Sequence, residues 1–451
     1  MKETYSRTKS VWQRMDADER QAVMDYGEKY KAFLDVARTE RLAADEIIRQ
    51  AEAAGFKPVY DMDSLKPGDK VYWNQKGKSV ILAVIGEEPV HAGIKIVGSH
   101  IDSPRLDLKA NPVHEQDGIV YFRTHYYGGI KKYQWTCIPL ALIGVVYTKD
   151  GKKVDINIGL KDDDPIFYVS DLLIHMAQDQ MKKTLAEGIT GEQLQAIAGT
   201  NAEEDLKPKE VFMKMLKDTY GIEEEDFAAA ELELVPATKS RDVGFDRSMI
   251  GAYGHDDRVC AYPILMAEID EKSPEYTSVT ILADKEETGS NGPTGMNSYF
   301  LKDFIEDLAD MAGCKVRHVA ANSHCFSADV NAAFDPIYGE VHERRNASYI
   351  NYGVVVTKYT GARGKAGTND ATAEMMGFAR RILDAEHVGW QTGELGKVDQ
   401  GGGGTVAMYV SQHNIDTVDL GVPVLSMHAP FEVVAKADVY MTYRAMRAFY
   451  K

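Results

Sequence analysis

Residues Thr277–Gly292, TSVTILADKEETGSNG, contain an apolar run that ends abruptly in acidic residues. The run up to Ala283 is typical of a buried strand, and two adjacent glutamates, Glu286 and Glu287, follow it. Because a strand sends successive side chains to opposite faces, neighbouring carboxylates at its end can do different work, one binding and the other reacting. A solvated turn would explain the glycines that follow, but not the paired carboxylates.

Strand-like and helical segments alternate on both sides of this stretch. The predicted strands are residues 79–85, 92–98, 277–283, 315–321, 352–357 and 417–425, and the predicted helical regions are 9–54, 256–270, 297–312, 369–385 and 433–449. Alternation of this kind predicts an α/β fold, a sheet with helices on both faces.

A β-rich segment interrupts the alternation. From residue 106 to about residue 160, alternating runs such as IVYFRTHYY are separated by turn signals, and residues 166–230 then read as helical with acidic patches. Residues 184–230 fit either an ordered or a disordered segment. A chain of 451 residues favours two domains. We therefore predict an α/β domain from residues 1–105 and 246–451, with residues 106–245 inserted as a β-rich domain.

Composition narrows the class of protein. The longest apolar runs, such as CIPLALIGVVY, fall short of the roughly 20 residues of a membrane span, and the N-terminus has no apolar signal core. A formal charge of −17 argues against nucleic acid as a partner, and part of it fits carboxylates gathered around cations. Four cysteines without CxxC pairing indicate free thiols. We expect a cytoplasmic protein that binds neither nucleic acid nor membrane.

Five short motifs carry residues suited to catalysis, and each lies near the end of a predicted strand, where α/β proteins build their sites. They are GSHIDSP (98–104), GHDDR (254–258), the Glu286-Glu287 pair, SADV (327–330) and SMHAP (426–430). Each has an ordinary alternative, such as a loop histidine, a helix N-cap or a turn aspartate. The functional interpretation depends on the five occurring together.

Taken together, the motifs hold ligands for two divalent cations that share one carboxylate: His100, Asp256, Glu287, Asp329 and His428. Zn²⁺ suits nitrogen and oxygen ligands, and Co²⁺ or Mn²⁺ can replace it. Two such ions would lower the pKa of a shared water and polarise a scissile carbonyl. Glu286, not needed as a ligand, would be the general base that passes the proton to the leaving amine. Asp102 can support the His100 imidazole, two residues before it.

In this order and at these spacings, GSHIDSP, HDDR, DKEETGS, SADV and SMHAP resemble the M18 metallopeptidases, the aspartyl aminopeptidase family. The resemblance spans His100 to His428. It implies a di-zinc α/β catalytic domain, an inserted dimerisation domain, and a tetrahedral dodecamer built from dimers whose active sites face an inner chamber. The roles it implies are His100 and Asp329 on one metal, Glu287 and His428 on the other, Asp256 as bridge, Glu286 as base and Asp102 as partner of His100.

Two further positions match the family less closely. His175, in FYVSDLLIHMAQDQ, falls where family members carry a histidine that reaches a neighbouring subunit's active site, although a helix-face histidine fits equally well. Arg363, in GARGKAG, falls near a basic residue linked to acidic substrates, although a solvated loop arginine fits too. The chain has Asp257 where the aspartyl branch commonly has Asn, and DKEETGS where DNEEVGS is usual. These departures leave the ligands intact and weaken the expectation of an acidic substrate.

The leading hypothesis is a di-metal aminopeptidase that removes acidic or neutral N-terminal residues from short peptides. One alternative is a metal-dependent carboxypeptidase or amidohydrolase on the same scaffold, which would need a cation for the substrate's α-carboxylate. Another is a non-catalytic assembly or cargo protein. A purely structural metal site has no use for Glu286, a glutamate beside a ligand that is not itself one.

Overall fold

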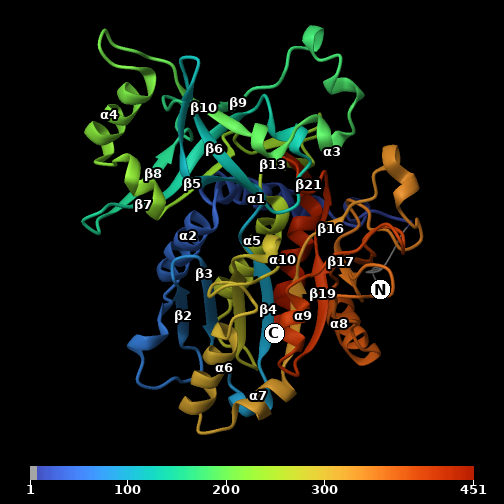
Figure 1. Ribbon diagram of the computed structural model, residues 1–451. Helices are drawn as coiled ribbons and strands as arrows, with labels where there is room; N and C mark the ends of the chain where they lie inside the picture. Colours follow the sequence, from blue (N-terminus) through green and yellow to red (C-terminus); the bar gives the residue numbers. More distant parts are fainter. Residues whose placement is uncertain (1–7) are drawn as a thin grey trace. The chain divides into compact units, whose positions relative to one another are not determined.

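The computed structural model describes residues 8–451, which form two compact units (Figure 1). The first unit contains the chain up to Asp102 together with Ser240–Met427 and Glu432–Lys451. The second contains Ser103–Lys239 and His428–Phe431. Both unit boundaries thus lie a few residues before the predicted ones, 105/106 and 245/246. The short segment His428–Phe431 also belongs to the second unit, which the sequence did not predict.

The first unit is built on a nine-stranded sheet with the order β1-β2-β3-β14-β4-β15-β19-β17-β18. The strands are β1 (Lys57–Pro58), β2 (Lys70–Gln75), β3 (Ser79–Val84), β14 (Ser278–Ala283), β4 (Lys95–His100), β15 (His324–Ala328), β19 (Asp416–Gly421), β17 (Val354–Thr357) and β18 (Trp390–Thr392). The central four, β14, β4, β15 and β19, are parallel to one another. Their carboxyl ends therefore share one edge, where ligand sites form in such sheets.

Helices cover both faces of this sheet, which confirms the predicted α/β fold. On one face Val80 and Leu82 of β3 pack into a core with α1 (Ala17–Val36), α2 (Glu40–Ala53), α5 (His255–Asp270), α8 (Ala373–Ala385) and α10 (Lys436–Tyr450). On the other, Ile81 and Ala83 pack with α6 (Phe300–Met311), α7 (Val316–Asn322) and α9 (Ala407–Ser411). The side chains of β3 alternate between two buried faces, and the strand therefore reads as continuously apolar.

The strand predicted at residues 315–321 is wrong: residues 316–322 form helix α7. The buried side chains Val319 and Ala320 follow Val316 at a spacing of three and four residues, so they share one helical face. The strand of this region comes directly afterwards as β15, residues 324–328. A short apolar run fits helix and strand equally well until its neighbours in the sheet are known.

A second, five-stranded sheet of the first unit lies beside the start of α5. Its order is β12 (Arg241–Val243), β13 (Met249–Ala252), β21 (Glu432–Ala435), β20 (Pro423–Leu425) and β16 (Asn331–Ala332). Strand β13 leads directly into the GHDDR motif at the start of α5. The pairing of β13 with β21 therefore positions the start of α5, where Asp256 and Asp257 still have non-helical backbone angles.

The second unit is a seven-stranded sheet that closes on itself. Its order is β11 (Ala230–Pro236), β5 (Arg105–Gln116), β6 (Ile119–Tyr127), β10 (Gln195–Gly199), β9 (Phe167–Val169), β7 (Pro139–Tyr147) and β8 (Lys153–Ile158), with β11 also paired to β7. The extra β11–β7 pairing covers the open edge of β11, whereas β8 remains the last strand of the order. Helices α3 (Leu185–Gly188) and α4 (Pro208–Tyr220) belong to the same unit.

The helical prediction for residues 166–230 holds only in part. Residues 167–169 and 195–199 are strands β9 and β10, because their backbones pair with each other and with β7 and β6. Residues 184–230 carry α4, β10 and several helical turns.

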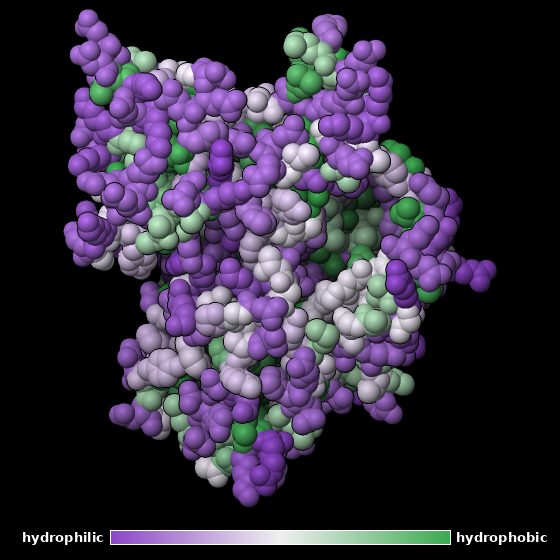
Figure 2. Space-filling view, in the orientation of Figure 1, coloured by the Kyte–Doolittle hydropathy of each residue, from purple (hydrophilic) through white to green (hydrophobic). Residues whose placement is uncertain are grey.

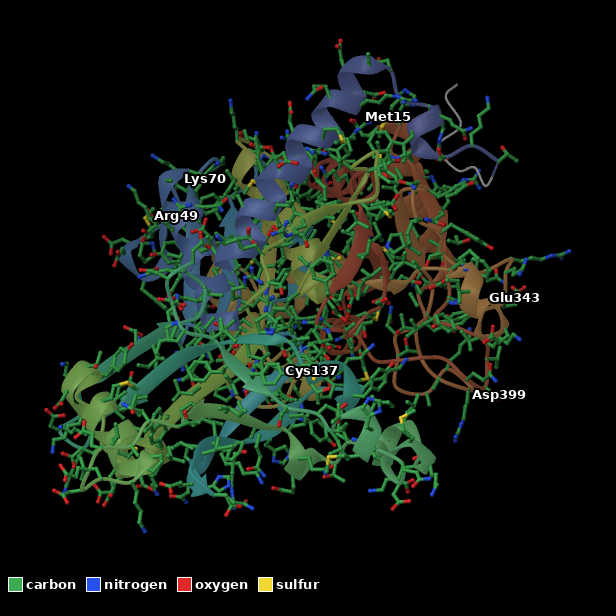
Figure 3. The ribbon with its side chains drawn as sticks, turned by 90° about the horizontal axis from the view of Figure 1, so that it is seen from above. Met15, Arg49, Lys70, Cys137, Glu343 and Asp399 are labelled. Carbon is green, nitrogen blue, oxygen red and sulfur yellow. The ribbon has the colours of Figure 1, made fainter. Side chains whose placement is uncertain are left out.

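Two further findings concern membrane-spanning helices and the cysteines. No helix within residues 8–451 is long and apolar enough to cross a bilayer. The four cysteines are free thiols, and only Cys137, labelled in Figure 3, is exposed.

Candidate metal centre

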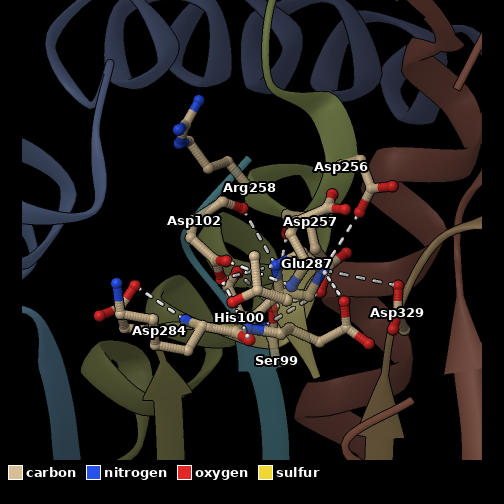
Figure 4. A network of polar contacts seen from close by, with 12 residues as sticks. Ser99, His100, Asp102, Asp256, Asp257, Arg258, Asp284, Glu287 and Asp329 are labelled. Carbon is tan, nitrogen blue, oxygen red and sulfur yellow. Dashed lines mark hydrogen bonds and ion pairs between the residues drawn. The ribbon is translucent and has the colours of Figure 1, made fainter. Parts of the chain in front are cut away.

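Three parallel neighbours in the main sheet bring the predicted site residues to one edge. Ala283 of β14 pairs with His100, the last residue of β4, and Ser327 of β15 pairs with Gly98. The side chains that follow these pairs therefore emerge next to one another. Helix α5 adds Asp256 from the adjoining sheet, so the acidic cluster in Figure 4 draws on four separate segments of the first unit.

The paired glutamates lie in a turn beyond the strand rather than on its two faces. Strand β14 ends at Ala283, and Glu286–Thr288 form a 3₁₀ turn between two left-handed residues, Lys285 and Gly289. Thus the turn that the glycines suggested also contains the paired glutamates. Both glutamates have carboxylate oxygens in ligand groups that include His100, so strand alternation, which would send them to opposite faces, is the wrong explanation.

Asp102 holds this turn in place. Its Oδ1 accepts a hydrogen bond from the backbone N–H of Glu286, and its Oδ2 accepts one from that of Glu287, both at 3.2 Å. The same Oδ1 lies 3.3 Å from Nδ1 of His100. A single buried carboxylate thereby orients the imidazole and both glutamates.

His100 lies at the centre of the cluster. Its Nδ1 is 3.0 Å from the backbone oxygen of Asp102, and its Nε2 is 3.1 Å from Oδ1 of Asp256. The same Nε2 is 3.8 Å from Oε2 of Glu286 and from Oδ1 of Asp329. Burial lowers the pKa of His100, but hydrogen bonds to Asp102 and Asp256 outweigh it, and the pKa ends well above its usual value. The surroundings of this imidazole are therefore strongly negative.

The carboxylates of the cluster are crowded enough to resist ionising together. Burial, and then the charges of Asp257 and Glu286, raise the pKa of Asp329 well above its usual value. Burial also raises the pKa of Asp257 to about 8, and the charge of Asp256 adds to the effect. Acidic groups packed this closely out of water need positive charge among them.

The geometry fits metal ions. Three groups of side chains have ligand atoms within 4.8 Å of one another: His100 with Glu286 and Asp329, His100 with Asp256 and Glu287, and Asp256 with Asp257 and Asp329. Imidazole nitrogen and carboxylate oxygen are ligands that zinc accepts. Each pair of these groups has one residue in common: His100, Asp256 or Asp329. The three groups therefore form one continuous centre rather than three separate sites.

Two residues that the sequence interpretation did not use position the Asp256 segment. The imidazole of His255 is buried between Tyr30, whose hydroxyl is 2.8 Å from Nδ1, and the backbone oxygen of Ile250, 3.1 Å from Nε2. Burial lowers the pKa of His255 to about 3, so this histidine is a neutral structural group. The backbone N–H of Asp256 donates to Glu432 at 3.1 Å. Nothing in the sequence distinguishes Glu432 from an ordinary acidic residue at the start of a strand.

Three predicted residues lie outside this cluster. His428 belongs to the second unit, where its Nδ1 is 2.7 Å from the backbone oxygen of Gly129. His175 is exposed in a helical turn of the same unit, Ile174–Met176. Arg363 is exposed in the first unit, in the loop between β17 and α8, with a left-handed backbone. The roles expected for these three residues stay predictions.

Comparison with known proteins identifies the family. Residues 33–450 match the family described as aminopeptidase I zinc metalloprotease, M18. A probable M18 family aminopeptidase 1 of Clostridium acetobutylicum is 47% identical, over 98% of this chain and 97% of that protein. One from Thermotoga maritima is 43% identical over 98% of each.

Solved structures agree with the sequence matches. The M18 aminopeptidase of Thermotoga maritima superposes with a TM-score of 0.94 at 42% identity, covering 98% of this chain and 99% of that one. Aminopeptidase I of Clostridium acetobutylicum gives 0.93 at 46% identity and 99% of both chains. A yeast mApe1 dodecamer shares the fold at 18% identity, with a TM-score of 0.76 over 94% of this chain and 95% of that one. The chain therefore belongs to the M18 family of zinc metalloproteases and is a metal-dependent aminopeptidase.

Proposed function

We propose that the centre holds two divalent cations, most favourably Zn²⁺, and that the enzyme removes N-terminal residues from short peptides. The observation that carries this proposal is the cluster of His100, Asp256, Glu286, Glu287 and Asp329, which supplies two groups with ligand atoms within 4.8 Å of one another, both containing His100. His100 and Asp329 would hold one ion and Glu287 and His428 the other, with Asp256 between them. Co²⁺ and Mn²⁺ share enough of zinc's ligand preference to substitute.

When bound, zinc polarises a carbonyl oxygen and lowers the pKa of a coordinated water. Glu286 then takes a proton from the attacking water at its Oε2 and delivers it to the leaving amine. Asp102 keeps this carboxylate in place by accepting the backbone N–H of Glu286. The acidic character of the centre also suits the free α-ammonium group of a peptide, the feature that separates an aminopeptidase from a carboxypeptidase.

The proposal extends to assembly. We expect a homo-oligomer, a tetrahedral dodecamer built from dimers, with the second unit as the dimerisation domain and His175 reaching a neighbouring active site. Support comes from residues 166–185, which expose Ile166, Tyr168, Leu172, Leu173, Ile174, Met176, Met181 and Leu185. Figure 2 shows apolar surface on this part of the second unit. Large exposed apolar patches mark interaction surfaces, and the yeast dodecamer is a precedent within the shared fold.

We further propose a cytoplasmic location, which the four free thiols support because disulfides are rare in reducing compartments. The expected partners are short peptides, with no role for nucleic acid or membrane, since a chain with a formal charge of −17 repels phosphate backbones.

The test is cleavage of aminoacyl-chromophore substrates with Asp, Glu, Leu, Met or Lys at the N-terminus, with added Zn²⁺, Co²⁺ or Mn²⁺ and again with chelator. We expect chromophore release that chelator abolishes and metal restores. Release that persists in chelator would contradict the metal mechanism. A second panel of peptides with a blocked N-terminus and a free C-terminus is run beside it, and cleavage of that panel alone would contradict the proposed direction of attack.

A further inference from the structure

The carboxyl group of Asp257 is a buried acid that the proposed mechanism does not use. It follows the ligand Asp256 directly and is 0% exposed. In Figure 4 it lies among the acidic side chains, whereas its neighbour Arg258 points away from them.

One oxygen of this carboxyl group is held firmly. Its Oδ2 accepts a hydrogen bond from the hydroxyl of Ser99 at 2.5 Å and a longer one from the backbone N–H of His100 at 3.4 Å. Both donors come from the end of strand β4. Asp257 is therefore fixed to the same backbone that carries the first metal-binding histidine.

The other oxygen has no donor. Within residues 8–451, Oδ1 of Asp257 has no hydrogen-bond partner. Apart from Ser99, the groups that favour the charged form of this carboxyl are the thiol of Cys260, a weak donor, and the imidazole of His100, itself a proposed metal ligand. The adjacent Arg258 does not neutralise it, because that guanidinium donates to the backbone oxygen of Arg38 at 3.2 Å. A buried carboxylate oxygen without a donor is costly, and it calls for a positive charge nearby.

A cation in the neighbouring cluster is the charge that fits. Asp257 forms one of the three ligand groups with Asp256 and Asp329, with oxygens within 4.8 Å of one another. At such distances, and with the Asp257 side chain itself buried, a carboxylate attracts a divalent ion strongly even without coordinating it.

We propose that Asp257, held by Ser99, strengthens divalent-cation binding at Asp256 and Asp329 through its charge, from outside the set of coordinating atoms. The inference rests on the proposed metal centre. Asp257 thus acts through the ligands, and its effect is measured as metal affinity rather than as turnover alone.

The test compares metal affinity in full-length protein stripped by chelator. Dissociation constants for Mn²⁺ and Co²⁺ are measured by metal-buffered titration of the wild type and of Asp257→Asn, which keeps the size and an acceptor for Ser99 but removes the charge. We expect affinity to fall about 10- to 100-fold, the usual effect of losing a partner behind the ligands. Asp257→Ser provides a second uncharged variant should the asparagine variant not fold.

Two control variants separate charge from geometry. Ser99→Ala removes the hydroxyl that holds the Asp257 carboxylate but leaves the negative charge of Asp257 in place. This variant should lose clearly less metal affinity than Asp257→Asn. Glu268→Gln removes a different buried carboxyl group of the same unit, outside the cluster, and should bind metal as the wild type does. Equal losses in Ser99→Ala and Asp257→Asn would overturn the charge argument.

The visible spectrum of bound Co²⁺ provides a separate check. Since Asp257 acts from outside the coordinating atoms, the Asp257→Asn protein should show the wild-type bands, reached at higher Co²⁺ concentration. Altered bands would make Asp257 a ligand and overturn the inference, as would unchanged affinity. Failure of the wild type to bind Co²⁺ at all would instead refute the proposed function.

Discussion

Glu286 and Glu287 are identical neighbours for which we propose different roles. Their backbone N–H groups donate to the two oxygens of one carboxylate, that of Asp102, and the 3₁₀ turn brings both side chains to the cluster around His100. Oε2 of Glu286 lies 3.8 Å from Nε2 of His100, and Glu287 joins the ligand group of His100 and Asp256. Because residue type is the same, only position within the turn can separate the proposed base from the proposed ligand.

Replacing Glu286 by Gln should therefore abolish turnover while leaving metal content nearly unchanged. We expect kcat to fall by about 10²- to 10⁴-fold, the usual contribution of a general base, with two ions per subunit retained in elemental analysis. Glu287→Gln is the matched variant, and it should lose metal together with activity. Equal loss of metal in both variants would show that the roles are assigned wrongly.

Arg363 permits a second test at the same scale. If the exposed guanidinium of Arg363 binds the acidic side chain of a substrate, Arg363→Ala should raise KM for substrates with N-terminal Asp or Glu. It should have little effect on Leu or Met substrates, because these have no charge to lose a partner. Arg363→Lys keeps the charge and should fall between. A uniform change across all five substrates would remove Arg363 from the specificity site.

Among the elements, β14 is joined to two helices by a buried polar cluster. Its Ser278 and Thr280 donate hydrogen bonds to the carboxyl group of Glu268 on α5, at 2.8 and 3.0 Å, and Thr280 also lies 2.6 Å from the hydroxyl of Tyr450 on α10. Burial raises the pKa of Glu268 from 4.5 to about 7, although these hydrogen bonds oppose the rise. The folded protein therefore holds a proton here that the unfolded chain releases.

The sign of the resulting pH dependence follows directly. Because the folded-state pKa is the higher, this group's contribution to stability is complete below about pH 4.5, declines as pH rises to about 7, and is then constant. The total loss is about 3 kcal/mol. Glu268→Gln removes it, so the melting temperature of the variant minus that of the metal-free wild type should increase from pH 5 to pH 8. A difference that stays constant with pH would contradict the buried-carboxyl account.

At the scale of the whole molecule, the apolar surface of residues 166–185 is the main feature without an intramolecular explanation. Ile174 is 62% exposed and Met176 is 70% exposed, on either side of His175. A buried interface between copies of the chain would cover this surface and bring His175 to a partner in a single step.

Charged substitutions on this surface should dissociate the assembly. We expect Ile174→Glu combined with Met176→Glu to lower the mass measured by light scattering and to reduce activity, because the subunit would lose a neighbour's His175. Phe245→Glu is the control, since Phe245 is fully exposed in the first unit and should leave the mass unchanged. A variant that stays fully assembled and active would contradict the role of this surface.

Complementation tests His175 itself. His175→Ala and Glu286→Gln subunits should each be nearly inactive alone, whereas mixed oligomers contain sites with both groups intact and should recover activity. Recovery requires His175 to act across subunits. Mixing without recovery would leave it as a surface histidine.

The sequence by itself determined the layers, the family motifs and most of the candidate residues of the centre, namely His100, Asp256, Glu286, Glu287 and Asp329 but not Asp257. Patterns of period 3.6 and 2 specify which side chains are buried, and a motif such as GSHIDSP keeps its spacing whatever surrounds it. The alternation of strands and helices was thus sufficient for the α/β fold, and five motifs were sufficient for the candidate ligands.

Only the tertiary structure decided what depends on contacts between distant segments. Residues 316–322 are a helix, and the place beside β4 and β19 is taken by residues 324–328. The turn that carries both glutamates is held because Asp102 accepts hydrogen bonds from both of their N–H groups. Asp257 became a functional candidate only when Ser99, far away in the chain, was found to hold it. Local patterns cannot report such pairings, because the partners are separated by long stretches of sequence and meet only once the sheet has formed.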